Sequence, residues 1–237
     1  MPVALLTGAS RGLGFALARS LVGDGWSVVI DARSAPDLDA AADALRAAAS
    51  AGAVVVTVPG DVADAAHRDD LIAAVRRLGR LDLLVNNASV LGPSPQPPLL
   101  TYPLDVFEDV HRVNVVAPLA LAQLAIPLLP REGGVIVNIT SDAAVEAYAG
   151  WGGYGSSKAA LEQVTNVLAV EHPDLRVYAV DPGDLRTQLH QDVFPGEDIS
   201  DRPLPEVAVP GFRAVIEGRL PSGRYRAQEL APAEAAS

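Results

Sequence analysis

Short apolar runs alternate with helical patterns along most of this chain, and this alternation constrains the fold more than any other feature. Residues 3–7 form a β-prone apolar run that ends at Gly8, and small and apolar residues then recur at helical spacing over residues 12–21. The same order of strand, turn and helix repeats down the chain. Because an intervening helix returns the chain to the same end of a sheet, this order predicts an α/β fold with a doubly wound parallel β-sheet.

The periodicities also predict where each element lies. Strands are expected at 3–7, 26–31, 53–58, 81–85, 135–139 and 175–180, with a seventh at 223–228. Helices are expected at 12–21, 38–50, 65–78, 104–129, 154–171 and 206–219, with Pro118 and Pro127 as the kink and end of the fourth.

Two irregular segments interrupt the alternation. Residues 91–103 are dense in proline and could link two domains, but the strand and helix pattern resumes after them, so we expect a loop at the ligand edge of the sheet. Residues 188–205 mix Phe, Pro, Gly and acidic residues without periodicity, which predicts a mobile lid. We therefore expect a single domain over residues 1–230, followed by a disordered tail at 231–237.

Composition narrows the classes of partner. The 237 residues are 49% hydrophobic, include no cysteine and carry a net charge of -11. The charge disfavours nucleic acid and anionic membranes as partners, and a thiolate metal site is excluded. The four histidines lie far apart, so each is expected at the surface or at a helix end, and no metal site is predicted. The N-terminus lacks a basic n-region, which favours a cytoplasmic protein.

Glycines punctuate the turn after the first strand. Gly8, Gly12 and Gly14 form the pattern G-x-x-x-G-x-G, in which Ser10, Arg11 and Leu13 occupy positions between the glycines. Without side chains the backbone can approach a pyrophosphate closely, and the N–H groups at the helix N-terminus stabilise its charge. An ordinary tight turn is the alternative interpretation of the pattern alone.

The second strand ends in two charged residues, Asp31 and Arg33. In dinucleotide folds an acidic side chain at this place binds the ribose hydroxyls, whereas an arginine accommodates a 2′-phosphate. Both residue types are present, so the pattern alone leaves the cofactor open between NAD and NADP.

Tyr154 and Lys158 stand at i and i+4, the spacing that places two side chains on one face of a helix. Lys158 is the only lysine in the chain. Arginine cannot be deprotonated, whereas a lysine ammonium can enter a proton relay and perturb the acidity of a neighbour. The alternative is a solvated lysine beside a half-buried tyrosine.

Taken together, these residues resemble the short-chain dehydrogenases/reductases over residues 3 to about 187. The resemblance implies a Rossmann fold of about seven strands in the order 3-2-1-4-5-6-7 and an NAD(P)-dependent carbonyl reductase or alcohol dehydrogenase. The matching pieces are T-G-A-S-R-G-L-G at 7–14, the pair Asp61 and Val62, N-N-A at 86–88, Asn114, Ser141, Y-G-S-S-K at 154–158, and P-G at 182–183 with Thr187.

The resemblance also implies roles for four catalytic residues. Tyr154 would give a proton to a carbonyl oxygen as a hydride arrives from the nicotinamide, and Lys158 would lower the tyrosine pKa from its free value of about 10. Ser141 would hold the carbonyl oxygen. Asn114 would connect Lys158 to solvent through an ordered water.

Cofactor contacts are implied at several further positions. Asp61 and Val62 would meet the adenine, and Arg11 and Arg33 would meet the 2′-phosphate, so NADP(H) is the expected cofactor with NAD(H) as the alternative. The backbone around Asn87 and Ala88 would line the cofactor. The remaining implied contacts are Gly8, Ser10, Gly12, Leu13, Gly14, Tyr154, Lys158, Pro182, Gly183 and Thr187.

The chain departs from the family pattern in two places. Ser89 stands where a glycine usually follows N-N-A, and Asp142 and Glu146 follow Ser141. The two carboxylates could bind a basic substrate group or face water. Segments 93–98, 145–153 and 188–205 should line the substrate, and Tyr148, Trp151 and Phe194 suggest a small apolar or aromatic compound.

Two other functions remain as alternatives. A cofactor-binding sensor or interaction module with the same fold would be expected to lack Tyr154 or Lys158. A hydrolase is disfavoured because the chain has no S-x-x-K and its four histidines lie far apart, while the G-x-S-x-G at residues 8–12 belongs to the glycine turn. Family members commonly pair the helices that correspond to 104–129 and 154–171, so a homodimer or homotetramer is expected.

Overall fold

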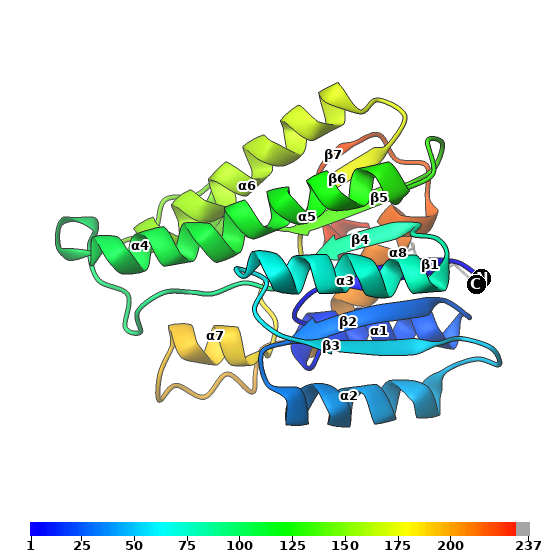
Figure 1. Ribbon diagram of the computed structural model, residues 1–237. Coiled ribbons are helices and arrows are strands. Elements are labelled where there is room, and N and C mark those ends of the chain that lie inside the picture. The colour runs from blue at the N-terminus through cyan, green and yellow to red at the C-terminus, as the bar shows by residue number, and fades with distance from the viewer. Residues whose placement is uncertain (231–237) are drawn as a thin grey trace, which may run out of the picture.

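Seven parallel strands form one sheet in the order β3-β2-β1-β4-β5-β6-β7 in the computed structural model, which describes residues 1–230 (Figure 1). Every neighbouring pair in the sheet is parallel, so the predicted fold class and strand order are confirmed. The predicted tail at 231–237 lies outside the described residues. The strands are β1 (Val3–Leu6), β2 (Ser27–Ala32), β3 (Val55–Pro59), β4 (Leu83–Asn86), β5 (Val135–Ile139), β6 (Arg176–Asp181) and β7 (Gly223–Arg226).

Helices cover both faces of this sheet (Figure 1). One face carries α1 (Gly12–Gly23), α2 (Ala35–Ala48) and α8 (Val209–Glu217). The other carries α3 (Ala65–Leu78), α4 (Leu104–His111), α5 (Ala117–Ala125) and α6 (Gly152–Glu171). A short helix, α7 (Gln188–Val193), lies apart from both layers.

The two apolar cores follow from the alternation of side chains along each strand. Within β1, Ala4 and Leu6 belong to the core beneath α1, α2 and α8, whereas Leu5 belongs to the core beneath α3, α5 and α6. All three side chains are fully buried. Because both faces of the sheet are covered, the central strands read as continuous apolar runs.

Three helix starts differ from the predicted boundaries. The second helix begins at Ala35 instead of residue 38, because the Ser34 hydroxyl accepts a hydrogen bond from the Asp37 N–H and caps the first turn. The helix predicted at 154–171 is α6, and it begins at Gly152, two residues before Tyr154. The last follows a 3₁₀ turn at Pro205–Ala208, and Pro210 sits in its first turn, where a missing N–H is tolerated.

The predicted long helix over 104–129 is present as a continuous run that changes its winding. After α4 it widens into a π-helical turn at Arg112–Val116, continues as α5 and ends in a 3₁₀ turn at Ile126–Leu128 that contains Pro127. Pro118 has no N–H to donate to the carbonyl of Asn114, four residues before it. The chain therefore accommodates Pro118 by widening the preceding turn, a form of π-helix often found at functional sites.

This run, Leu104–Leu128, is also the one helix within residues 1–230 that is long and apolar enough to cross a membrane by length and composition. Its buried residues include Leu121, Ala122 and Ala125, which pack in the core between the sheet and α3. The apolar composition therefore serves the packing of the helix against the sheet.

Two loops flank the carboxyl ends of the strands. Residues 91–103 are a loop with one short 3₁₀ turn at Leu99–Thr101, as expected from their prolines. The region predicted to lack periodicity contains a helix, α7, which Thr187 caps by accepting a hydrogen bond from the His190 N–H at 3.2 Å. A helix of six residues is too short to produce a clear repeat in the sequence, which is why the pattern did not predict it.

Candidate active site

A cleft of about 1530 Å³ runs along the carboxyl ends of the strands. Gly14 and Asn114 are the two predicted site residues that do not line it; they lie behind the cleft wall. The cleft therefore collects motifs that are far apart in the chain. The predicted residues that line it are Gly8, Ser10, Arg11, Gly12, Leu13, Arg33, Asp61, Val62, Asn87, Ala88, Ser141, Tyr154, Lys158, Pro182, Gly183 and Thr187.

The glycine loop is shaped by close backbone packing. Gly8 has φ of +64°, and a Cβ at this position would lie 2.9 Å from Cα of Ala88. At Gly14 a Cβ would lie 2.6 Å from Nδ2 of Asn87 and 2.7 Å from the Gly8 carbonyl oxygen. Larger residues at either position would push the loop off β4, so the glycines set the shape of the cradle as well as leaving it open.

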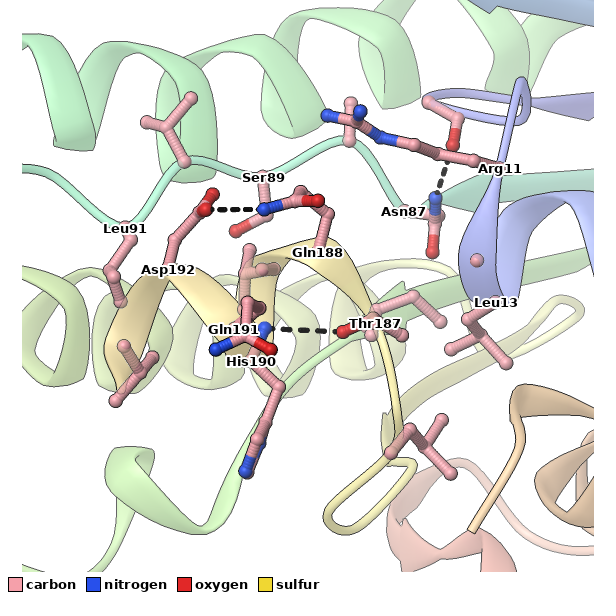
Figure 2. Close-up of a pocket in the computed structure, with 18 of the residues that line it drawn as sticks. Arg11, Leu13, Asn87, Ser89, Leu91, Thr187, Gln188, His190, Gln191 and Asp192 are labelled. Carbon is pink, nitrogen blue, oxygen red and sulfur yellow. Dashed lines mark hydrogen bonds between the residues drawn. The ribbon is translucent and has the colours of Figure 1, made fainter. Parts of the chain in front are cut away.

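Asn87 joins the glycine loop to the end of β4. Its Nδ2 donates to the carbonyl oxygens of Thr7 and Gly8 at 2.9 and 3.0 Å. The Thr7 hydroxyl in turn accepts from the backbone N–H groups of Asn87 and Ala88, each at 3.0 Å. In Figure 2 the Asn87 side chain lies next to the loop that carries Arg11. Two strand ends thus form one rigid floor, on which the N-terminus of α1 can receive a phosphate.

Asp31 is buried beneath this floor. Its Oδ1 accepts from the Gly8 N–H at 2.6 Å, and its Oδ2 lies 3.0 Å from Nε2 of His67, which is itself 6% exposed. Burial raises the pKa of Asp31, and the bonds from His67 and Gly8 oppose that rise. His67 lies in the first turn of α3, so it stands at a helix end as expected, but it is buried and not at the surface.

Arg11 and Arg33 have a different environment. Both are exposed and line the cleft, and neither side chain makes a hydrogen bond or ion pair with any described residue. Nearby, the Asp61 carboxylate accepts from the Ala63 N–H at 2.8 Å and Val62 is 7% exposed. This end of the cleft therefore offers two free cations beside a partly apolar wall, which fits a phosphorylated nucleoside.

Tyr154 and Lys158 lie on α6 and face the cleft, 6% and 2% exposed respectively. Nζ of Lys158 donates to the Ile139 carbonyl at 2.8 Å and stands 5.4 Å from the centre of the Tyr154 ring. Burial lowers the pKa of Lys158 to about 8 and raises the pKa of Tyr154, although hydrogen bonding with Ser141 opposes the second shift. The expectation that Lys158 lowers the tyrosine pKa is not met here, because burial dominates and the ammonium is directed at Ile139.

Ser141 is held by the residue that follows it. Its hydroxyl donates to Oδ1 of Asp142 at 2.8 Å, and the Tyr148 hydroxyl lies 2.9 Å from both Asp142 Oδ2 and Glu146 Oε2. Burial alone would raise the pKa of Asp142, but the hydrogen bonds from Ser141, Tyr148 and the Ala143 N–H lower it. The sequence left open whether Asp142 and Glu146 bind a basic substrate group or face water. In the structure both carboxylates are hydrogen-bonded to neighbouring side chains.

Asn114 supports the cleft from behind. Its Nδ2 donates to the Val90 carbonyl and to the Ser157 hydroxyl, at 2.9 and 3.0 Å. Its Oδ1 accepts from the Val90 N–H at 2.9 Å and from the Ser89 hydroxyl at 3.2 Å. Both amide hydrogens are used within the protein, so a water that links Asn114 to Lys158, as the family resemblance implies, would have to donate to an oxygen of Asn114, and this link stays a prediction.

The last predicted contacts lie where α7 approaches the glycine loop. A Cβ at Gly12 would lie 3.5 Å from Cγ2 of Thr187, and Gly183 adopts φ of +73° after the end of β6. Figure 2 shows α7 crossing the cleft, with Gln188 and Asp192 on the side that faces the Ser89 to Leu91 segment. These two side chains form a hydrogen bond of 2.7 Å, and the Ser94 hydroxyl donates to the Asp192 carbonyl.

Two expected substrate contacts are wrong. Tyr148 and Phe194 do not line the cleft, whereas Trp151 does. Tyr148 instead turns to Asp142, and Phe194 stacks on His190 with ring centres 5.2 Å apart. An aromatic residue in the sequence does not indicate what it contacts, and each of these two contacts a residue close to it in the chain.

A partly buried charge network next to Ser141 was missed by the sequence reasoning. Arg224 on β7 bonds to Glu162 at 2.9 Å and to Asp181 at 3.1 Å, and the Thr140 hydroxyl donates to Glu162 at 2.6 Å. The signal in the sequence was Asp181 itself, since a carboxylate that ends a buried apolar strand requires a partner. No group of three or more His, Cys, Asp or Glu side chains in residues 1–230 is placed to hold a metal ion.

Comparisons with known proteins agree with this geometry. A family model described as short chain dehydrogenase matches residues 2–198. The chain is 36% identical over 192 residues to dehydrogenase/reductase SDR family member 4 of Bos taurus, covering 79% of this chain and 67% of that protein. It is 32% identical over 237 residues to 3beta-hydroxysteroid dehydrogenase 1 of Eggerthella lenta, covering 98% of this chain and 84% of that one.

Solved structures share the fold over nearly the whole chain. A short chain dehydrogenase from Pseudomonas syringae has a TM-score of 0.87 and 32% identity, with 96% of this chain and 94% of that chain covered. One from Shigella flexneri, complexed with NADP, has a TM-score of 0.87 and 28% identity, with coverage of 96% and 97%. Because sequence and fold agree over most of its length, the chain belongs to the short-chain dehydrogenase/reductase family of NAD(P)-dependent oxidoreductases that act on alcohol and carbonyl groups.

Proposed function

We propose that this protein is an NADP(H)-dependent oxidoreductase that transfers a hydride between the nicotinamide and a carbonyl or secondary alcohol of a small, apolar substrate. The observation that carries the proposal is the distribution of charge at the adenosine end of the cleft. Two exposed arginines are free of partners among the described residues, while the one carboxylate that ends β2 is buried and engaged elsewhere.

Arg11 and Arg33 would hold the 2′-phosphate of the cofactor. A guanidinium offers a planar fork of donors that matches a phosphate, and neither fork is used within residues 1–230. Asp31 would not serve the ribose hydroxyls, because it is 1% exposed and each of its oxygens already has a hydrogen-bond partner. Gly8, Ser10, Gly12 and Leu13 would surround the pyrophosphate.

The chemistry would occur at Tyr154. When bound, the cofactor supplies the hydride that reduces the carbonyl carbon or accepts it from the alcohol carbon. Tyr154 would donate its phenolic proton to the carbonyl oxygen during reduction and take it back during oxidation. Because burial raises its pKa, the tyrosine is held as the proton donor that carbonyl reduction requires.

Ser141 and Lys158 would assist this proton transfer. The Ser141 hydroxyl, oriented by Asp142, lies beside Tyr154 and could turn to the substrate oxygen. Lys158 would contact the nicotinamide ribose with the part of its ammonium not bound to Ile139. Asn114 would act as a support, since it fixes Val90 and Ser157 next to these groups.

The substrate would enter between the 91–103 loop and α7. Leu91, Ala143 and Tyr154 form an apolar cluster, against which Trp151 and Val193 pack. An apolar surface next to the proposed proton donor supports a small apolar carbonyl compound as substrate. Residues 188–205 would close over it as a lid within a single domain of residues 1–230.

We also propose that the protein is cytoplasmic and works as a homodimer or homotetramer through α4, α5 and α6. Val116 in the π-helical turn between α4 and α5 is 54% exposed, and Val167 and Val170 on α6 are 43% and 82% exposed, so they offer apolar area for such pairing. Light scattering at micromolar concentration tests this, and a mass of 24.6 kDa would contradict it.

The test of the cofactor is a fluorescence titration of the protein with NADPH and with NADH. Arg33→Ala should weaken NADPH binding by about tenfold and leave NADH within about twofold, since the lost contact is specific to the phosphate. Arg19→Ala is the matched control, because Arg19 is exposed on α1 but does not line the cleft. An unchanged preference in Arg33→Ala would contradict the proposal.

A sensor or interaction module with the same fold is the alternative. It would bind NADPH without turnover, so a screen of apolar ketones and aldehydes with saturating NADPH distinguishes the two. Oxidation of NADPH by any of these compounds, lost in Tyr154→Phe, supports the enzyme.

A further inference from the structure

The proposed chemistry leaves one buried pair of titratable side chains unused. Asp31 is 1% exposed and His67 is 6% exposed, and they meet at 3.0 Å under the adenosine end of the cleft. A buried carboxylate lowers the stability of the fold unless each of its oxygens accepts a hydrogen bond. A pair of this kind next to a binding cleft is therefore expected to have a role there.

The pair connects three segments that form this end of the cleft. Asp31 ends β2 and holds the glycine loop through the Gly8 N–H at 2.6 Å. His67 comes from the first turn of α3, which follows the cap residue Asp64. Its ring fills the space above Gly60, where a Cβ would lie only 2.2 Å from Nδ1. Gly60 in turn precedes Asp61, the residue proposed to meet the adenine.

The position of the carboxylate has a direct consequence for the cofactor. A free acidic side chain at the end of the second strand accepts hydrogen bonds from ribose hydroxyls and so favours NAD. The same charge repels a 2′-phosphate, because two anions at short range in a partly buried site interact strongly. Asp31 lines the cleft but is only 1% exposed, and Gly8 and His67 each bond to one of its oxygens.

We propose that His67 is a specificity-determining residue, which makes the site selective for NADP(H) by holding the Asp31 carboxylate beneath the glycine loop and away from the ribose. The inference rests on the proposed function, in which Arg11 and Arg33 bind the phosphate. It assigns the selectivity to two effects, attraction by the arginines and withdrawal of an anion by the histidine.

The test measures dissociation constants for NADPH and NADH by fluorescence titration, using the full chain. His67→Leu leaves Asp31 without its partner, so NADPH should bind about tenfold more weakly while NADH binds within about threefold of the wild type or more tightly. His172→Leu is the matched control, because His172 lies at the end of α6 and does not line the cleft.

A second substitution separates selectivity from structure. Asp31→Asn keeps an oxygen for the Gly8 N–H but removes the negative charge. The double variant Asp31→Asn/His67→Leu should therefore return NADPH affinity to within about threefold of the wild type. Asp31→Asn alone should retain NADPH binding, which keeps the test decisive if His67→Leu does not fold.

The outcomes distinguish this inference from the proposed function. A wild-type protein that does not prefer NADPH would contradict the proposed function. A wild-type preference for NADPH, combined with equal weakening of both nucleotides in His67→Leu, would overturn only the inference. A double variant as weak as His67→Leu, or a loss of NADPH binding of about tenfold in Asp31→Asn, would overturn it as well.

Discussion

The two ends of the cleft are built in different ways. At the adenosine end the walls are strand ends and a glycine turn, joined by hydrogen bonds between backbone groups and the side chains of Thr7, Asn87 and Asp31. At the substrate end the walls come from the 91–103 loop, the segment after Ser141 and α7. The Ser94 hydroxyl joins the loop to α7, and side-chain hydrogen bonds of Asp142 with Ser141 and Tyr148 hold the middle segment.

This difference determines how each end can be changed. The adenosine end depends on backbone positions that only small residues allow, so single methyl groups should disturb it. The substrate end depends on side chains that can be exchanged without moving the sheet, which is how one fold serves many substrates. Three substitutions test the comparison.

The largest effect is expected where the two ends meet, at Lys158. Lys158→Met should reduce kcat/KM for carbonyl reduction by about a thousandfold, because the ammonium proposed to hold the nicotinamide ribose beside Tyr154 is lost. The same change should stabilise the fold at neutral pH by on the order of 1–3 kcal/mol, since burial lowers the Lys158 pKa from 10.5 to about 8.

Thermal unfolding at several pH values checks the second half of this prediction. The unfolded chain binds the lysine proton more tightly than the folded one, so wild-type stability should rise with pH between about 8 and 10.5. Lys158→Met should lose this contribution. A lower melting temperature for the variant at neutral pH would contradict the argument.

An intermediate effect is expected at the adenosine end. Gly14→Ala should weaken NADPH binding by about tenfold to a hundredfold, because the new Cβ would lie 2.6 Å from Asn87 and displace the glycine loop. Gly25→Ala is the control: Gly25 has φ of +82° but nothing within 4 Å of a Cβ, so only backbone strain is added. Equal NADPH affinity in the two variants would show that the loop tolerates displacement.

The smallest effect is expected at the substrate end. Asp142 contributes to the raised pKa of Tyr154, after burial and together with Asp181, so Asp142→Asn should let the tyrosine ionise at lower pH. The rise of alcohol oxidation with pH should then move to lower pH, with a change in rate of a few fold at neutral pH. Glu146→Gln is the control, because Glu146 is not among the charges that act on Tyr154.

The pH profile of alcohol oxidation by Asp142→Asn can also contradict this view of the substrate end. If Asp142→Asn leaves the pH dependence of oxidation in place and only raises KM, the carboxylate acts by shaping the pocket. Its bond to Ser141 would then matter more than its charge.

The amino-acid sequence by itself determined the order of strands and helices, the glycine turn and the shared face of Tyr154 and Lys158. Each of these depends on residues close together in the chain, where apolar periodicity and the missing Cβ of glycine act directly. The sheet order came from the family resemblance, and the structure agrees with it.

Only the tertiary structure decided which side chains form hydrogen bonds with one another. Asp31 and His67 are 36 residues apart, and Ser89 and Asn114 are 25 apart, so no local pattern could pair them. The direction of the Tyr154 pKa shift depends on burial by the whole fold, which outweighs the neighbouring lysine. Local rules therefore predict the elements, whereas long-range packing sets the partners and charge states on which selectivity depends.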